Sequence, residues 1–320
     1  MLTPRCRPRE PTPWRTRWRK PSSWHSPASQ KLLSTWRRKI MLERHLRALV
    51  GERHAISSPA ALRQAEEYLA TQMRLLELDV STQTFTAFKG TYRNIIGRLP
   101  AGDRKAVGRP PLIIAAHYDT VNNSPGADDN ASGLAVMLDV ARKVQNSPVA
   151  REVRFIAFCL EEADLIGSLA YAASLRNAGE DISGALVLEC VGFASAKEGS
   201  QLTPPGVPIK VPGVGDFLAV IGNQASAHLV GAMEGAAKRH VPDLKTVSLI
   251  VPGNGEQLPD TRRSDHAAFW HHGYPAIMLT DTANFRNPHY HRSTDTLETL
   301  DLDFMRKVSK TVTAMVRMWP

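Results

Sequence analysis

Short apolar runs alternate with helical segments along most of this chain, and this alternation constrains its fold more than any other feature. The runs Leu112–Ala116, Val153–Leu160 and Ala185–Leu188 are short and largely apolar. Such runs are typical of strands that are buried on both faces of a parallel sheet. Apolar residues recur at helical spacing between the first two runs, over residues 131–146. The alternation predicts the α/β class, as a three-layer α/β/α sandwich with a mainly parallel, mixed central sheet.

Local signals predict the remaining elements. Ser58-Pro59 is a helix start with Ser at the N-cap and Pro at the first helical position, and Ser264 is expected to cap another short helix. The Gly- and Pro-rich stretch 199–216 predicts a long loop that forms a rim or lid. The other expected elements are strands over Val80–Phe88, Tyr92–Leu99, Phe217–Ile221, Thr246–Val251 and Pro275–Leu279, and helices over about 167–177, 225–239 and 301–317.

The positive net charge of +9 is confined to the first 40 residues. These hold eleven Lys or Arg, one acid and four of the six tryptophans, whereas the other 280 residues hold 29 basic and 30 acidic side chains. Three interpretations fit residues 1–40: an arm that binds nucleic acid or anionic lipid, a disordered segment, or a stretch that precedes a natural start at Met41. We expect an arm that is disordered or outside the natural chain, and a single domain over 41–320 that does not bind nucleic acid.

Cysteine and hydropathy patterns bear on the compartment. Three cysteines, Cys6, Cys159 and Cys190, do not make a disulfide framework, and the last two end apolar runs as buried thiols would. No apolar run approaches the roughly 20 residues that a transmembrane helix needs, and no signal-peptide pattern is visible. The sequence therefore predicts a cytoplasmic protein without a transmembrane segment.

Acids and histidines directly follow the apolar runs. His117 and Asp119 follow the first run, Glu161 and Glu162 the second, and Glu189 the third. Asp129 lies between the first two runs in an acidic turn, Gly126–Gly133, and Asp281 and Tyr290-His291 follow the last strand. Because sites in parallel sheets lie beyond the carboxyl ends of the strands, these side chains are expected to meet at one edge.

Such a cluster of carboxylates requires a counter-charge. Carboxylates packed together raise one another's pKa, and a divalent cation removes that penalty. Two histidines with three carboxylates suit zinc, and a carboxylate can bridge two ions about 3.5–4 Å apart. The residue types therefore predict a metal site that contains one or two zinc ions.

The order and spacing of these motifs resemble the di-zinc aminopeptidases of clan MH, the bacterial leucine aminopeptidase type. The resemblance covers about residues 41–317. It rests on His117-Tyr118-Asp119, Gly126-Ala127-Asp128-Asp129-Asn130-Ala131-Ser132-Gly133, Glu161-Glu162 with Gly167-Ser168, Glu189, Ser264-Asp265-His266 and Tyr290-His291.

The resemblance implies two zinc ions per chain and assigns their ligands. One ion would be held by His117, Asp129 and Glu189, and the other by Asp129, Glu162 and His291. Glu189 departs from the family, where Asp is common at this position. Glu remains an oxygen ligand, but its extra methylene can change the metal spacing, so Co²⁺ or Mn²⁺ are expected as substitutes.

The resemblance also implies the chemistry. The chain would hydrolyse the N-terminal peptide bond of peptides with a free N-terminus, through a metal-bridging hydroxide and with Glu161 as general base. Asp119 would orient His117, and Tyr290 would donate to the oxyanion. Asp129 is selected as the bridging ligand, which leaves Asp128 to support the loop, with Gly126 and Gly133 as its flexible ends.

Several alternatives remain at this level. The same fold supports a carboxypeptidase or a glutaminyl cyclase, and a non-catalytic binding module would have lost ligands that this chain retains. Asp265 and His266 are either supports of the site or structural residues. Arg262 and Arg263 either contact a substrate carboxylate or lie on the surface. The preferred N-terminal residue and the oligomeric state stay open.

Overall fold

A computed structural model describes residues 41–102 and 108–320. The expectations for residues 1–40 lie outside this part of the chain. Within it, the helices are all too short or too polar to cross a bilayer. Residues 41–49 are helical, and the elements that follow agree closely with the expected pattern of alternating strands and helices.

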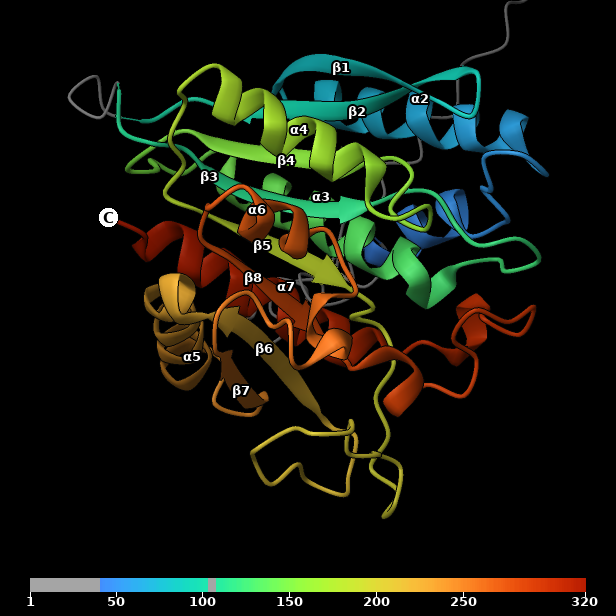
Figure 1. Ribbon diagram of the computed structural model, residues 1–320, viewed down its shortest axis with the longest axis vertical. Helices are drawn as coiled ribbons and strands as arrows, with labels where there is room; N and C mark the ends of the chain where they lie inside the picture. The colour runs from blue at the N-terminus through green and yellow to red at the C-terminus, as the bar shows by residue number, and fades with distance from the viewer. Residues whose placement is uncertain (1–40, 103–107) are drawn as a thin grey trace, which may run out of the picture. The chain divides into compact units, whose positions relative to one another are not determined.

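Eight strands form one mixed sheet in the order β1-β2-β4-β3-β5-β8-β6-β7 (Figure 1). Neighbouring strands are parallel from β4 through β3 and β5 to β8, while β1 and β2 are antiparallel at one side and β6 runs antiparallel to β8 at the other. The sheet confirms the predicted fold class. Its strands are β1 (Asp79–Ala87), β2 (Gly90–Leu99), β3 (Leu112–His117), β4 (Val153–Phe158), β5 (Gly184–Glu189), β6 (Phe217–Asn223), β7 (Lys245–Val251) and β8 (Ala276–Thr280).

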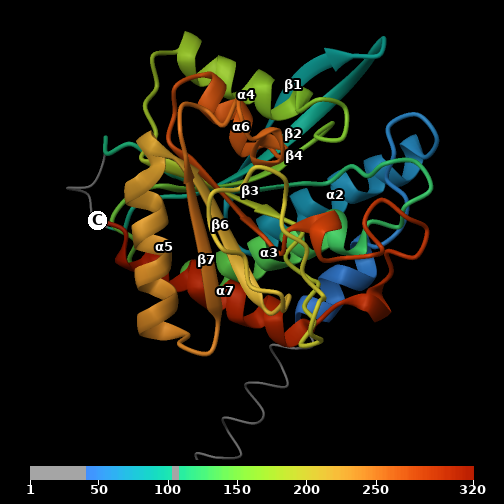
Figure 2. The ribbon, with the colours of Figure 1, turned by 60° about the horizontal axis from the view of Figure 1, so that its bottom comes forward.

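Helices cover both faces of the sheet and complete the three layers (Figure 2). One face carries α2 (Pro59–Leu75), α3 (Gly133–Val144), α5 (Ala227–His240) and α7 (Leu302–Met318), and the other carries α4 (Ile166–Asn177) and α6 (His266–His271). Ser58 stands at the N-cap of α2 with Pro59 after it, as expected.

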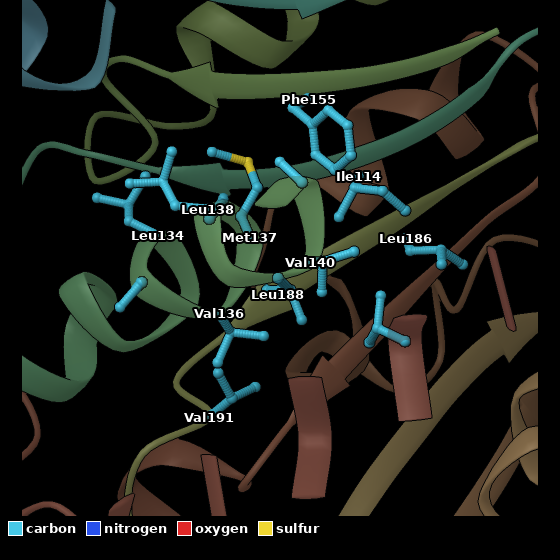
Figure 3. Close-up of a cluster of buried hydrophobic side chains, with 14 of the residues drawn as sticks. Ile114, Leu134, Val136, Met137, Leu138, Val140, Phe155, Leu186, Leu188 and Val191 are labelled. Carbon is cyan, nitrogen blue, oxygen red and sulfur yellow. The ribbon is translucent and has the colours of Figure 1, made fainter. Parts of the chain in front are cut away.

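The central strand β3 shows how the sequence builds this sandwich. Ile114 packs in the larger core beneath α3 and α7, whereas its neighbours Ile113 and Ala115 pack in the smaller core beneath α4 and α6. Successive side chains of a strand point to opposite faces, so a run buried on both faces must be apolar throughout. Figure 3 shows the larger core, where Met137 of α3 lies near Phe155 of β4.

Two local predictions were wrong in detail. Strand β4 ends at Phe158 and not at Leu160, because Leu160 adopts a left-handed backbone (φ 62°) that an extended strand cannot accommodate. Ser264 does not cap α6: Asp265 stands at the N-cap, and the Ser264 hydroxyl instead donates to Glu189 Oε2 at 2.8 Å. Both departures place side chains at the carboxyl edge of the sheet.

Candidate metal centre

Parallel pairing brings the predicted polar residues to one edge of the sheet. His117 is the last residue of β3, Glu189 is the last residue of β5, and Glu161 and Glu162 follow β4. These three strands are parallel neighbours, with β3 in the middle. Their carboxyl ends therefore meet at one place, although the residues lie up to 72 positions apart in the sequence.

Asp129 lies at the centre of this cluster. Its Oδ1 is 3.1 Å from His117 Nε2, and its Oδ2 is 3.0 Å from His291 Nε2. His117 Nε2 is also 3.3 Å from Glu189 Oε2, and His291 Nε2 is 3.3 Å from Glu162 Oε2. The two oxygens of Asp129 thus face two separate sets of donors, each containing one imidazole and one further carboxylate.

The donor atoms fit a metal ion. Two atoms bound to one tetrahedral zinc at about 2.0–2.1 Å lie roughly 3.3 Å apart, close to the separations within both sets. Among the described residues, His117 Nε2, both oxygens of Asp129 and Glu162 Oε1 are buried without a directed hydrogen bond. Buried polar atoms are normally paired, so these converging unpaired atoms indicate that a cation completes the site.

The charges of the cluster lead to the same conclusion. Burial raises the pKa of Glu161 well above its usual range, and burial together with the charge of Asp129 raises the pKa of Glu162 to about 7. Burial opposes ionisation of Asp129 too, but its contacts with His117 and His291 are stronger and lower its pKa. Burial lowers the pKa of His291, but its contacts with Asp129 and Glu162 outweigh burial and raise this pKa to about 10. Without metal, the cluster therefore needs bound protons as counter-charge.

The segment that carries Asp129 is held in a non-helical conformation. Asp129 has φ −105° and ψ 89°, within the tight turn Ala127–Ser132. Asp295 accepts hydrogen bonds from the backbone N–H groups of Asp128 and Asp129 at 2.9 and 3.2 Å. The turn begins at Gly126 (φ 60°), where a Cβ would lie 2.4 Å from the Asp129 carbonyl oxygen. These contacts aim the Asp129 carboxylate at the two histidines.

Gly133 has a different role from the flexible end that we predicted. It has ordinary right-handed helical angles (φ −60°), so it adds no special backbone freedom. A Cβ there would lie 2.3 Å from Asn130 Oδ1 and 2.9 Å from the Leu188 carbonyl oxygen. Gly133 therefore allows helix α3 to approach the end of β5 closely.

Asp119 supports three residues of the cluster. Its backbone carbonyl lies 3.2 Å from His117 Nδ1, and its Oδ1 lies 3.6 Å from the same nitrogen. Its carboxylate accepts the backbone N–H groups of Glu161 and Glu162 at 3.1 and 3.2 Å. Leu160 enters this turn with its left-handed backbone, a conformation that is held where surrounding contacts require it. Asp119 thus fixes the position of both glutamates as well as the imidazole.

Glu189 is oriented by residues whose contacts could not be foreseen. Its Oε2 accepts from Ser264 Oγ at 2.8 Å and from Asn130 Nδ2 at 3.4 Å, and its Oε1 accepts from Cys190 Sγ at 3.2 Å. Cys190 is buried and has a left-handed backbone (φ 48°). Asp295 carries no sequence signal of its own. Asn130 belongs to the acidic-turn motif and Cys190 was expected to be buried, but the contacts through which they act form only in the folded chain.

Asp128 and Asp281 lie beside the cluster and tie loops together. Asp128 accepts the Gly192 N–H at 2.8 Å and the Asn287 side-chain amide at 2.7 Å. Asp281 accepts the N–H groups of Phe193 and Ala283 at 2.9 and 2.8 Å. Neither acid faces the histidines. Asp128 therefore supports the loop, as the resemblance implied.

The structure distinguishes the roles of Asp265 and His266, which the sequence left open between support of the site and a structural role. His266 is fully buried, its Nε2 lies 2.8 Å from the Thr261 carbonyl oxygen, and its ring packs edge-on against Trp270, which makes it structural. Asp265 is buried near Glu161, Glu189 and Asp119, and burial raises its pKa to about 7. It therefore belongs to the surroundings of the cluster.

Tyr290 and Arg263 form the outer part of the site. The Tyr290 ring stacks on the His291 ring, with centroids 3.9 Å apart and an angle of 16° between the planes. Arg263 Nη2 donates to the Tyr290 hydroxyl oxygen at 3.1 Å, which leaves the phenolic hydrogen free to donate elsewhere. Arg263 thus reaches the site through Tyr290, and its guanidinium also contacts Asp260 and Asn284.

An apolar cavity of about 90 Å³ adjoins the cluster, and both Glu189 and Tyr290 line it. Its walls come from β6, β7, β8 and the predicted rim loop 199–216, and include Phe217, Ile221, Leu249, Met278, Val207 and Ile209. The loop thus forms part of the cavity wall, as the prediction of a rim required. A mostly apolar cavity beside converging polar groups is the usual form of a binding site for a small ligand.

A three-layer α/β/α sandwich with a histidine–carboxylate cluster at the carboxyl edge of its sheet is the arrangement of a metal-dependent enzyme. The chain belongs to peptidase family M28, whose sequence profile matches residues 94–316. This finding bears out the predicted clan MH peptidase family.

Two relatives and two solved structures illustrate the match. The chain is 33% identical over 283 residues to the uncharacterized protein YfbL of Escherichia coli, covering 83% of this chain and 84% of that protein. It is 30% identical over 237 residues to aminopeptidase YwaD of Bacillus subtilis, covering 71% of this chain but only 44% of that protein.

The structures support the fold. A zinc aminopeptidase of Bacillus subtilis, BSAP, superimposes with a TM-score of 0.67 at 18% identity, covering 87% of this chain and 94% of that structure. A glutaminyl cyclase of Porphyromonas gingivalis superimposes with a TM-score of 0.62 at 18% identity, covering 87% and 96%. At such identities the likeness shows the shared architecture alone.

Proposed function

We propose that this chain is a zinc-dependent aminopeptidase that holds two zinc ions and releases the N-terminal residue of peptides. The observation that carries the proposal is the position of Asp129, whose two oxygens face two separate donor sets at 3.0–3.1 Å. His117 and Glu189 would complete one site, and His291 and Glu162 the other. Aminopeptidase YwaD, which matches over 71% of this chain, supports the choice of reaction.

The bound zinc ions would supply Lewis acidity and make water acidic enough to react near neutral pH. The side chains would supply proton transfer and positioning. Glu161 lies at the cluster, with Oε2 3.7 Å from His117 Nε2, and is close enough to His117 and Glu189 to reach a metal ion; we assign it the proton transfer because the resemblance reserves it for this role. Glu161 takes a proton from the attacking water and later returns one to the leaving amine. Tyr290 donates its hydroxyl hydrogen to the developing oxyanion.

The apolar cavity beside Glu189 and Tyr290 supports a preference for substrates with an apolar N-terminal residue. Its apolar walls would bury an aliphatic side chain, whereas a charged side chain there would lose its hydration. Arg263 also lines this cavity, and its guanidinium already contacts Asp260 and Tyr290. This engagement favours an aminopeptidase over a carboxypeptidase that would use the guanidinium to bind a substrate carboxylate.

A comparison of free and blocked peptides tests the reaction. The zinc-loaded protein should cleave leucyl-alanine amide and leave its N-acetylated form intact, because an aminopeptidase requires the free amine. Product formation is followed by liquid chromatography, and zinc per chain is measured by atomic absorption. Equal cleavage of both peptides would exclude an aminopeptidase, and cyclisation of an N-terminal glutamine without hydrolysis would show a glutaminyl cyclase instead.

Removing the hydroxyl of Tyr290 tests its assigned role. Tyr290→Phe should lower kcat by about 10²–10³-fold, the usual effect of losing one oxyanion donor, and leave KM and zinc content nearly unchanged. The ring that stacks on His291 is retained in this variant. Tyr171→Phe, at a buried tyrosine within α4, is the matched control. An unchanged kcat in Tyr290→Phe would contradict the oxyanion role.

A further inference from the structure

A second cavity borders the ligand cluster at Glu162 and Asp119. It measures about 140 Å³, and its lining includes Glu162, Asp119, Ile56 and Phe88. The first cavity is lined instead by Glu189 and Tyr290. The two cavities thus share no lining residue, and each is lined by one of the two glutamates whose neighbouring histidines face different oxygens of Asp129. A peptide whose scissile bond lies over Asp129 has room for side chains on both sides.

The outer wall of this second cavity is unusually apolar for a surface. In the described part of the chain, six large apolar side chains are exposed, and two of them, Ile56 (69%) and Phe88 (55%), both line it. They come from different segments, the loop before α2 and the turn between β1 and β2 (Figure 2). Exposed apolar side chains that converge from separate segments next to a site indicate a ligand-binding surface.

The turn that presents Phe88 has a strained backbone. Phe88 and Lys89 both adopt left-handed angles, with φ 47° and 59°, in the two-residue connection between Ala87 and Gly90. Asparagine and glycine favour this conformation, whereas a bulky aromatic residue disfavours it. If this turn served only to join the two strands, asparagine or glycine in place of Phe88 would make it more stable. The presence of phenylalanine here favours a role for its side chain.

We propose that Ile56 and Phe88 form a binding site for the side chain of the substrate residue that follows the scissile bond, and that this site favours apolar and aromatic residues. The inference rests on the proposed aminopeptidase function. If the N-terminal side chain occupies the cavity beside Glu189, the leaving part of the peptide passes Glu162 and reaches Ile56 and Phe88. The specificity would then depend on two residues of the substrate.

Amidated dipeptides with leucine first and a varied second residue test this site. We expect kcat/KM for leucyl-phenylalanine amide to exceed that for leucyl-glycine amide by about tenfold, as a partly buried apolar group provides. Phe88→Ala and Ile56→Ala should each reduce this ratio several-fold, mainly through KM. Their preference for the first residue, measured with amides that vary only there, should stay unchanged.

Leu75→Ala is the matched control, because Leu75 is exposed to the same extent (68%) at the end of α2 and does not line the cavity. It should keep the wild-type ratio. Equal rates for both dipeptides in the wild type, or an unchanged ratio in both cavity variants, would overturn the proposed binding site while leaving the peptidase function intact. Failure to cleave any dipeptide would instead overturn the function and this inference together.

Discussion

Replacing Glu161 by glutamine is expected to lower kcat/KM by about 10²–10⁴-fold, the usual contribution of a general base, and to leave two zinc ions bound. The glutamine amide has nearly the same shape but does not accept a proton from water. The backbone N–H of residue 161 still donates to Asp119, so the turn is retained. Activity is measured with leucyl-alanine amide, and metal content by atomic absorption.

The neighbouring Glu162→Gln variant separates the two glutamates. Glu162 Oε2 lies 3.3 Å from His291 Nε2, and its Oε1 is buried without a hydrogen bond, as expected of a ligand. This variant should bind one of the two zinc ions more weakly, whereas Glu161→Gln should not. If Glu161→Gln lost metal and Glu162→Gln kept it, the roles of base and ligand would be exchanged. Full activity in Glu161→Gln would reject it as the base.

Asp129→Asn is expected to have the second large effect: zinc per chain falls from two to one or none. The loss in kcat/KM should exceed the roughly 10–100-fold that residues supporting a metal ligand contribute. One oxygen of Asp129 faces His117 and the other faces His291, and an asparagine offers only one oxygen in their place. Metal content, zinc affinity and kcat/KM are measured together on protein whose melting temperature has been checked.

Asp128→Asn is the matched control for this change. Asp128 is the preceding residue and is equally buried, but it contacts Gly192 and Asn287 instead of the histidines. We expect it to keep two zinc ions and most of the activity. Loss of metal in Asp128→Asn with retention in Asp129→Asn would show that Asp128, and not Asp129, is the metal ligand of the acidic turn.

Much of the fold was predictable because the amino-acid composition of each strand reflects how deeply that strand is buried. Strand β3 (Leu112–His117) lies between two other strands under helices on both faces, and its apolar side chains from Leu112 to Ala116 follow from that position. The errors lie at the ends of elements. Leu160 was assigned to a strand because it is apolar, but it turns left-handed so that Glu161 faces the edge of the sheet.

The sequence by itself determined the fold class, the polar residues at the carboxyl edge and, through its motifs, the family. Only the tertiary structure decided which oxygen of Asp129 faces which histidine, that Asp295 holds the acidic turn, and that Ile56 and Phe88 line one cavity with Glu162. The physical reason is the sequence separation over which each interaction acts. Burial and backbone preference act on each segment and leave a local pattern, whereas hydrogen bonds and shared cavities join residues that are distant in sequence and leave none.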